Sequence, residues 1–144
     1  MSIPDAAIEI IEHFEGLRLK AYRCPAGIWT CGVGHTGSDV VEGLVISEDV
    51  AEEWLRLDLE SADEALDRLV KVPLNPNQRA ALLSLVFNIG QGAFAGSTLL
   101  KLLNLGHYDQ AGQQFHRWNK AGGVALAGLT NRRAAERELF ETEI

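Results

Sequence analysis

Apolar side chains recur at helical spacing near the start of the chain. Ile8, Ile11 and Phe14 fall on one face of a helix, and Pro4 suits a first helical turn. The spacing therefore predicts a helix over residues 3–15, which a glycine follows.

A period of two replaces the helical period after this glycine. Two short runs of alternating apolar and polar side chains flank a Cys-Pro-Ala-Gly turn signal at residues 24–27. We predict a β-hairpin lobe that extends to residue 46 and folds back over the end of the first helix. This fold would carry Cys24 and Thr30 toward Glu15.

Two longer apolar patterns follow the hairpin. Ser47 is a good N-cap, and the stripe behind it continues to Pro73, which predicts a helix over residues 47–72 that could bridge two lobes. Asn75 then caps a segment that is apolar all round. We expect this second helix, which Gly90 ends, to be the buried centre of a second lobe.

Shorter elements complete the chain. Ser97 predicts the start of a short helix, and the apolar positions from Tyr108 to Trp118 indicate an amphipathic helix. Residues 121–128 have the composition of a loop, and we expect the last helix to begin at Thr130.

The predicted fold class is α+β, mainly helical, in a single domain of 144 residues. Residues 1–46 form a helix and hairpin lobe, residues 47–72 the connecting helix and residues 73–144 a helical lobe. A cleft is expected between the two lobes. The hydrophobic content of 47% and charged content of 23% are ordinary for a folded soluble protein.

The net charge of −7 argues against a nucleic-acid-binding protein. The first residues lack the basic region of an export signal, and no eighteen apolar residues follow one another, so we expect neither a signal peptide nor a membrane anchor. The two cysteines, Cys24 and Cys31, are then expected to be free thiols. A disulfide between them would block any chemistry at Cys24.

Glu15 is the first candidate for chemistry. It occupies the last turn of the predicted first helix, where the negative end of the helix dipole and partial burial favour a protonated carboxyl group. A protonated carboxyl group opposite Cys24 and Thr30 has a proton available near neutral pH. We interpret these three residues as a site.

The spacing Glu15-x8-Cys24-x5-Thr30, followed by Gly-x-Gly-His at residues 32–35, resembles the active-site segment of phage-type lysozymes. These are the lambdoid and T-even endolysin family of muramidases, glycoside hydrolase family twenty-four. Further blocks that are similar to the family occur in the right order at residues 75–90, 94–99, 118–123 and 128–133. The resemblance therefore covers nearly the whole chain and implies a two-lobe, lysozyme-like fold.

The resemblance implies an endolysin that hydrolyses the β-1,4 bond between N-acetylmuramic acid and N-acetylglucosamine in bacterial peptidoglycan, giving host cell lysis. It implies that Glu15 is the general acid and that Cys24 and Thr30 act on the far face of the sugar. Its glycan-lining positions match Thr36, Phe87 and Asn131.

Cys24 departs from the Asp that the family usually has here, although Cys also occurs. A thiol is mostly protonated near neutral pH, so it is a poorer base than a carboxylate but a better soft nucleophile. Two mechanisms stay open. Cys24 and Thr30 hold a water for displacement with inversion, which we favour, or Cys24 attacks and gives a thioglycosyl intermediate with retention.

Several other side chains have structural interpretations. A His after Gly-x-Gly, here His35, more often fixes a loop than acts in catalysis. Together with Cys24 and Cys31 it lacks the close paired spacing of a structural zinc site, and no metal or organic cofactor is expected. We expect core positions for Trp54, Tyr108, Phe115 and Trp118, and either a core or a glycan-lining position for Phe87.

Charge is unevenly distributed along the chain. Acidic residues crowd residues 39–67, whereas cations dominate residues 71–137. We hypothesise that this second part, including Arg132 and Arg133, presents a positive surface to the anionic cell wall. Two ordinary solvated helix faces are the alternative.

The expected partner is the glycan strand of peptidoglycan, with no nucleic acid and no membrane insertion. By resemblance, we expect a monomer that stays in the host cytoplasm until a holin-type lesion releases it to the periplasm and cell wall. The alternatives are a lysozyme-like module that binds peptidoglycan without cutting it, and a thiol protein built on Cys24 and Cys31.

Overall fold

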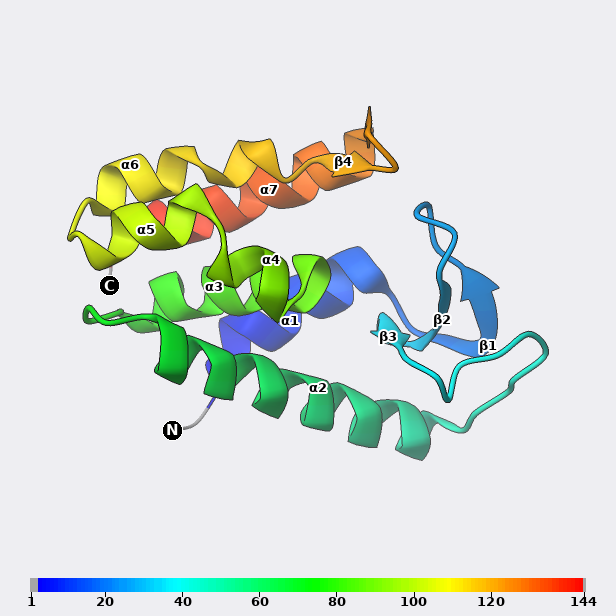
Figure 1. Cartoon of the computed structure of the whole chain (residues 1–144). Coiled ribbons are helices and arrows are strands. Elements are labelled where there is room, and N and C mark those ends of the chain that lie inside the picture. Colours follow the sequence, from blue (N-terminus) through cyan, green and yellow to red (C-terminus); the bar gives the residue numbers. More distant parts are fainter. Residues whose placement is uncertain (1–2, 144) are drawn as a thin grey trace.

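The computed structural model describes residues 3–143, and residues 1, 2 and 144 lie outside this part. Helix α1 (Asp5–Glu15) leads into a three-stranded antiparallel sheet with strand order β1-β2-β3. Its strands are β1 (Arg18–Arg23), β2 (Trp29–Gly32) and β3 (His35–Thr36), and in Figure 1 they lie at the end of the molecule opposite the marked termini. The predicted hairpin is confirmed, and β3 adds a short third strand to it.

The segment that follows the sheet returns along the open edge of β1. The Ala21 N–H donates to the Leu44 carbonyl at 2.8 Å, and the Ile46 N–H donates to the Leu19 carbonyl at the same distance. These bonds satisfy backbone groups that an edge strand would otherwise leave unpaired. The small lobe is therefore held to the start of the next helix.

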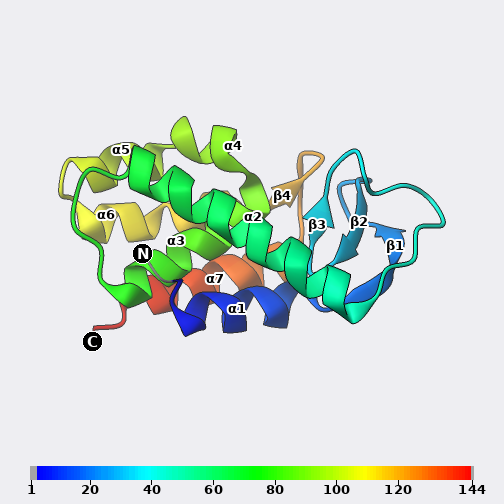
Figure 2. The ribbon, with the colours of Figure 1, turned by 90° about the horizontal axis from the view of Figure 1, so that it is seen from below.

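Helix α2 (Glu48–Leu69) bridges the two lobes, as its apolar stripe predicts (Figure 2). The Ser47 side chain accepts a hydrogen bond from the Val50 N–H, so this predicted N-cap is confirmed. Leu59 packs with Ile11 and Val33 beside the sheet, whereas Leu66 packs into the core of the helical lobe. One helix thus contributes to both hydrophobic clusters.

Helix α3 (Pro76–Ile89) is the buried centre of the helical lobe, and it contacts α1, α2 and α7 (Ala127–Glu141). The Asn75 side chain accepts from the Gln78 N–H at 2.7 Å, and the Gln78 side chain accepts from the Asn75 N–H at 2.9 Å. This reciprocal capping box explains why the helix begins here. Helix α1 packs against α3 and α7, so in space it lies with the helical lobe.

The remaining elements are short. They are α4 (Gln91–Ala95), α5 (Thr98–Asn104), α6 (Tyr108–Gln113), the 3-10 helix η1 (Phe115–Arg117), β4 (Lys120–Ala121) and β5 (Val124–Ala125). Of these, α4 contacts α3. The Ser97 cap of α5 is confirmed, with the Ser97 hydroxyl accepting from the Leu100 N–H at 3.1 Å. None of the helices over residues 3–143 combines the length and apolar character needed to cross a membrane.

The predicted loop over residues 121–128 and the predicted start of α7 at Thr130 are both wrong. Gly122 and Gly123 both adopt positive φ angles, 58° and 80°, which closes a two-residue turn between β4 and β5. Helix α7 begins at Ala127 without a side-chain cap, since Leu126 is apolar. The Leu126 N–H donates to the Asn119 carbonyl, and this bond fixes the entry of the chain.

Candidate functional site

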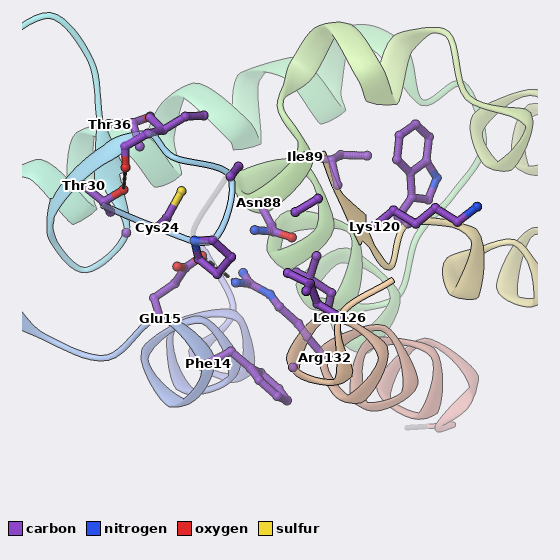
Figure 3. A pocket seen from close by; sticks show the side chains of 18 of the residues that line it. Phe14, Glu15, Cys24, Thr30, Thr36, Asn88, Ile89, Lys120, Leu126 and Arg132 are labelled. Carbon is purple, nitrogen blue, oxygen red and sulfur yellow. Dashed lines mark hydrogen bonds and ion pairs between the residues drawn. The ribbon is translucent and has the colours of Figure 1, made fainter. Parts of the chain in front are cut away.

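A cleft with a volume of about 850 Å³ lies between the sheet and the helical lobe. Its walls come from the end of α1, the sheet, the end of α3, the β4–β5 hairpin and the start of α7 (Figure 3). The predicted residues that line it are Glu15, Cys24, Thr30, Thr36 and Phe87. The fold therefore brings together residues that the chain separates widely.

Glu15 ends α1 and faces the cleft with a side chain that is 16% exposed. Its carboxylate forms an ion pair with Arg132 of α7, with 2.5 Å between Oε2 and Nη1, drawn as a dashed line in Figure 3. Gly34 touches the other side of this carboxylate. A Cβ atom at Gly34 would lie 2.7 Å from Glu15 Cδ, so only glycine fits there.

Arg132 belongs to a buried charge cluster, which also contains Arg133, Glu136 and Ser84. The Arg132 Nε atom lies 3.3 Å from Glu136 Oε2, and its Nη2 donates to the Ser84 carbonyl at 3.2 Å. The Ser84 hydroxyl donates to Glu136 Oε2 at 2.5 Å. One guanidinium thus holds Glu15 on one side and Glu136 on the other.

The hypothesis of a positive surface that includes Arg132 and Arg133 is wrong. Both side chains are almost fully buried, with 4% and 1% exposure, because they neutralise carboxylates inside the protein. Arg79, a third cation of this segment, is also buried and pairs with Asp63 at 2.6 Å. Counting charges along the chain cannot separate such internal ion pairs from a charged surface.

Cys24 begins the turn between β1 and β2 and lines the cleft as a half-buried thiol. Both Cys24 and Cys31 are free, and Cys31 is fully buried on the other side of the strand pair. The expectation of free thiols is confirmed. Thr30 is 3% exposed, and its hydroxyl donates to the Ile28 carbonyl at 3.0 Å. The lone pairs of this hydroxyl can still accept a hydrogen bond.

The three residues that resemblance matched with glycan-lining positions lie in different places. Thr36 is exposed at the end of β3, and Phe87 is half-buried near the end of α3, and both line the cleft. Asn131 is exposed on α7 and falls outside the described cleft lining. The structure therefore brings Thr36 and Phe87 to the cleft but not Asn131.

Other cleft residues escaped the sequence analysis. Trp118, expected in the core, packs on the core with one part and lines the cleft with another. Lys120 brings a cation to the cleft rim. Tyr22 also lines the cleft, and burial, together with the charge of Glu15, raises the pKa of its phenol. Alternation along β1 could have placed Tyr22 on the face of the sheet opposite Ala21.

His35 fixes the sheet to α2. Its Nδ1 lies 2.7 Å from Asp58 Oδ2, its Nε2 lies 3.1 Å from Asp39 Oδ1, and its ring is 4.2 Å from the ring of Trp54. Within residues 3–143, no three His, Cys, Asp or Glu side chains gather closely enough to hold a metal ion.

Comparisons with known proteins agree with this geometry. A family model described as Phage lysozyme matches residues 12–136. The chain is 47% identical to the endolysin of Acyrthosiphon pisum secondary endosymbiont phage 1, over 99% of each chain. It is 46% identical to the endolysin of Salmonella phage P22, over 97% of this chain and 98% of the relative.

Solved structures give the same result. The muramidase domain of SpmX from Asticaccaulis excentricus superposes with a TM-score of 0.86 and is 41% identical, with 99% of each chain covered. A crystal structure of a P22 lysozyme mutant superposes with a TM-score of 0.81 and is 46% identical, also over 99% of each chain. Because the family model matches residues 12–136, most of the chain, and the cleft contains Glu15, Cys24 and Thr30, the chain belongs to the phage lysozyme family.

Proposed function

We propose that this chain is a phage endolysin, a muramidase that hydrolyses the β-1,4 bond between N-acetylmuramic acid and N-acetylglucosamine in bacterial peptidoglycan. The observation that carries the proposal is the position of Glu15, whose carboxylate faces a cleft of about 850 Å³ and is fixed by Arg132 and Gly34. Endolysin relatives that match almost the full chain support the same activity.

Glu15 is the proposed general acid. Hydrolysis of a glycosidic bond needs a proton on the leaving oxygen while the sugar passes through an oxocarbenium-like transition state. The contact with Arg132 and the close approach of Gly34 restrict the orientation of this carboxyl group. A fixed acid can meet the glycosidic oxygen without a further loss of side-chain entropy.

Cys24 and Thr30 are the proposed partners on the other side of the scissile bond. The Thr30 hydroxyl donates to the Ile28 carbonyl, which leaves its lone pairs to accept a hydrogen bond from a water molecule. We propose that Cys24 and Thr30 hold this water for single displacement with inversion at the anomeric carbon. Direct attack by the Cys24 thiolate would instead give retention.

Thr36 and Phe87 are the proposed glycan contacts in the cleft, through a hydroxyl and an aromatic face. Asn131 is exposed on α7, so we propose that it contacts glycan only where a strand extends beyond the cleft. By family resemblance, we also propose that the protein acts as a monomer and reaches the wall through a holin-type lesion in the host membrane.

The decisive experiment measures the clearing of outer-membrane-permeabilised cells and identifies the products by mass and by the anomer released first. We expect wild type to clear and to release reducing muramic acid ends, Glu15→Gln to lose clearing, and Cys24→Asp to keep it. A β to α change in the first product would support the held water, whereas retention would support attack by Cys24. If Cys24→Asp clears cells and wild type does not, the natural protein binds glycan without hydrolysing it.

A further inference from the structure

Glu136 is a second carboxylate near the site, and its side chain is completely buried in α7. It touches Arg132 on the same helix, with 3.3 Å between Oε2 and Nε, and it accepts the Ser84 hydroxyl of α3 at 2.5 Å. Arg133 approaches its other oxygen, with 2.8 Å between Nε and Oε1. A buried carboxylate with this many partners is connected directly to the residue that holds Glu15.

The two carboxylate oxygens of Glu136 differ in their hydrogen bonds. Although Glu136 and Arg133 are close, Arg133 Nε, Arg133 Nη1 and Glu136 Oε1 have no hydrogen-bond partner among the described residues. Burial lowers the pKa of Arg133 to about 10. Glu136 Oε2 instead takes the hydrogen bonds from Ser84 and from both arginines. This oxygen therefore connects Ser84, Arg132 and Arg133.

Arg132 creates a conflict for the proposed reaction. A general acid must carry a proton at the working pH, yet a guanidinium in direct contact stabilises the ionised carboxylate. An anion on the other side of the same guanidinium weakens this effect, because it lowers the charge that Arg132 and Arg133 together present to Glu15 from two units to one. Burial raises the pKa of Glu136, while Arg133, Arg132 and the Ser84 hydroxyl favour its ionised form, and in that form Glu136 is this anion.

We propose that Glu136 is a positioning residue that offsets one of the two arginine charges beside Glu15, so that Arg132 can orient Glu15 with less stabilisation of the ionised carboxylate. The inference rests on the proposed role of Glu15 as general acid. Besides Arg132, the charged and titratable groups around Glu15 and Glu136 are Arg133 on α7, Tyr22 on β1 and Cys24 in the β1–β2 turn. Ser84 and Asn88 of α3 supply the neutral contacts.

The first test replaces Glu136 by Gln and follows two quantities in parallel. One is the alkaline limb of the pH–rate profile for wall hydrolysis, and the other is the ¹³C titration of the Glu15 carboxyl group. We expect both to move to lower pH by roughly one unit, because the removal of a unit charge beyond one guanidinium in a partly buried site changes a proton equilibrium about tenfold. Glu136→Asp, which restores the charge, should move both back toward the wild-type position.

The matched control is Asp63→Asn, which also removes a buried carboxylate from a buried arginine, Arg79, but away from Glu15. It should lower the melting temperature and leave both titrations unchanged. A second variant, Arg133→Gln, removes a cation and should move both titrations to higher pH, opposite to Glu136→Gln. This variant keeps the test informative if Glu136→Gln does not fold.

The outcomes separate the inference from the proposed function. If Glu136→Gln and Arg133→Gln lose stability but leave the Glu15 titration where it is, Glu136 is only structural and the inference is wrong. If the titration moves as expected but Glu15→Gln still hydrolyses walls, the charge balance holds and the proposed role of Glu15 as general acid is wrong.

Discussion

At the scale of single residues, Gly34 is a position where the site leaves no room for a side chain. The residue has a φ of 67°, and a Cβ atom there would lie 2.7 Å from Glu15 Cδ. We expect Gly34→Ala to displace the Glu15 carboxyl group and to lower the rate of wall hydrolysis by about 100-fold. Cell-clearing rates measured at matched concentrations of folded protein check this.

Gly27 provides the matched control for this prediction. Its φ is 80°, but a Cβ atom there would meet no described atom within 4 Å. Gly27→Ala should therefore lower the free energy of unfolding by on the order of 1 kcal/mol, as backbone strain alone would, and leave the rate of wall hydrolysis nearly unchanged. Equal losses of activity in the two variants would mean that backbone strain, not contact with Glu15, is responsible.

The two cysteines should differ sharply in reactivity. Cys24 is half-buried in the cleft, whereas Cys31 is 0% exposed. We expect iodoacetamide to label Cys24 alone in the folded protein and to stop wall hydrolysis, since the added group would occupy the place of the attacking water. Mass spectrometry of tryptic peptides locates the label, and Cys24→Ser should take up none until it is unfolded. Full labelling at Cys24 with undiminished hydrolysis would contradict the proposed role.

Residue spacing was a good guide where the chemistry is local and a poor one where it is not. Glu15, Cys24 and Thr30 lie within sixteen consecutive residues, so a helix end and a hairpin predict their convergence. Arg132 comes from the other end of the chain, and only the packing of α7 against α1 and α3 makes it a partner of Glu15. The spacing of Arg132 and Glu136, four residues apart, was the available signal for an internal ion pair.

At the scale of elements, two serine caps offer a direct comparison. The Ser97 hydroxyl is buried, donates to the Phe94 carbonyl at 2.7 Å and accepts from the Leu100 N–H at 3.1 Å. The exposed Ser47 hydroxyl accepts from the Val50 N–H at 3.3 Å. We expect Ser97→Ala to lower the free energy of unfolding by about 1–2 kcal/mol and Ser47→Ala by roughly 0.5 kcal/mol, measured by urea denaturation. The reverse order would mean that burial does not strengthen the Ser97 cap.

The starts of the helices also depend on local contacts in some cases and on distant contacts in others. Ser47, Asn75 and Ser97 start helices where the sequence predicts, because each cap bonds to a residue only three positions ahead. The start of α7 could not be predicted in this way. Leu126 offers no capping side chain, and its position depends on the Asn119 carbonyl across the β4–β5 turn.

At the scale of the whole molecule, the burial of Arg79, Arg132 and Arg133 leaves a surface that is mainly acidic, with a net charge of −7 for the chain. Peptidoglycan also carries carboxylates on its stem peptides. We therefore expect binding of the Glu15→Gln variant to purified walls to strengthen as salt rises from about 10 mM to about 150 mM, since shorter Debye lengths screen the repulsion. Co-sedimentation with walls measures this. Binding that weakens steeply over the same range would indicate a local cationic contact, for which Lys120→Glu is the next variant.

The two-lobe fold could be predicted from the pattern of apolar positions, because each lobe has its own hydrophobic cluster and one long amphipathic helix joins the lobes. How the first helix is placed was not accessible. Residues 1–46 are contiguous in the chain, yet α1 packs against α3 and α7, and a long-range arrangement of this kind depends on shape rather than on periodicity.

Because α1 packs with the helical lobe, the proposed catalytic residues come from two different lobes. Glu15 is carried by the helices, whereas Cys24 and Thr30 are carried by the sheet, and α2 links the two. The rate of wall hydrolysis should therefore depend strongly on the distance between the two lobes. A cross-link that holds the lobes slightly apart would leave both halves folded and the glycan able to enter, while the acid and the water could no longer reach the same sugar.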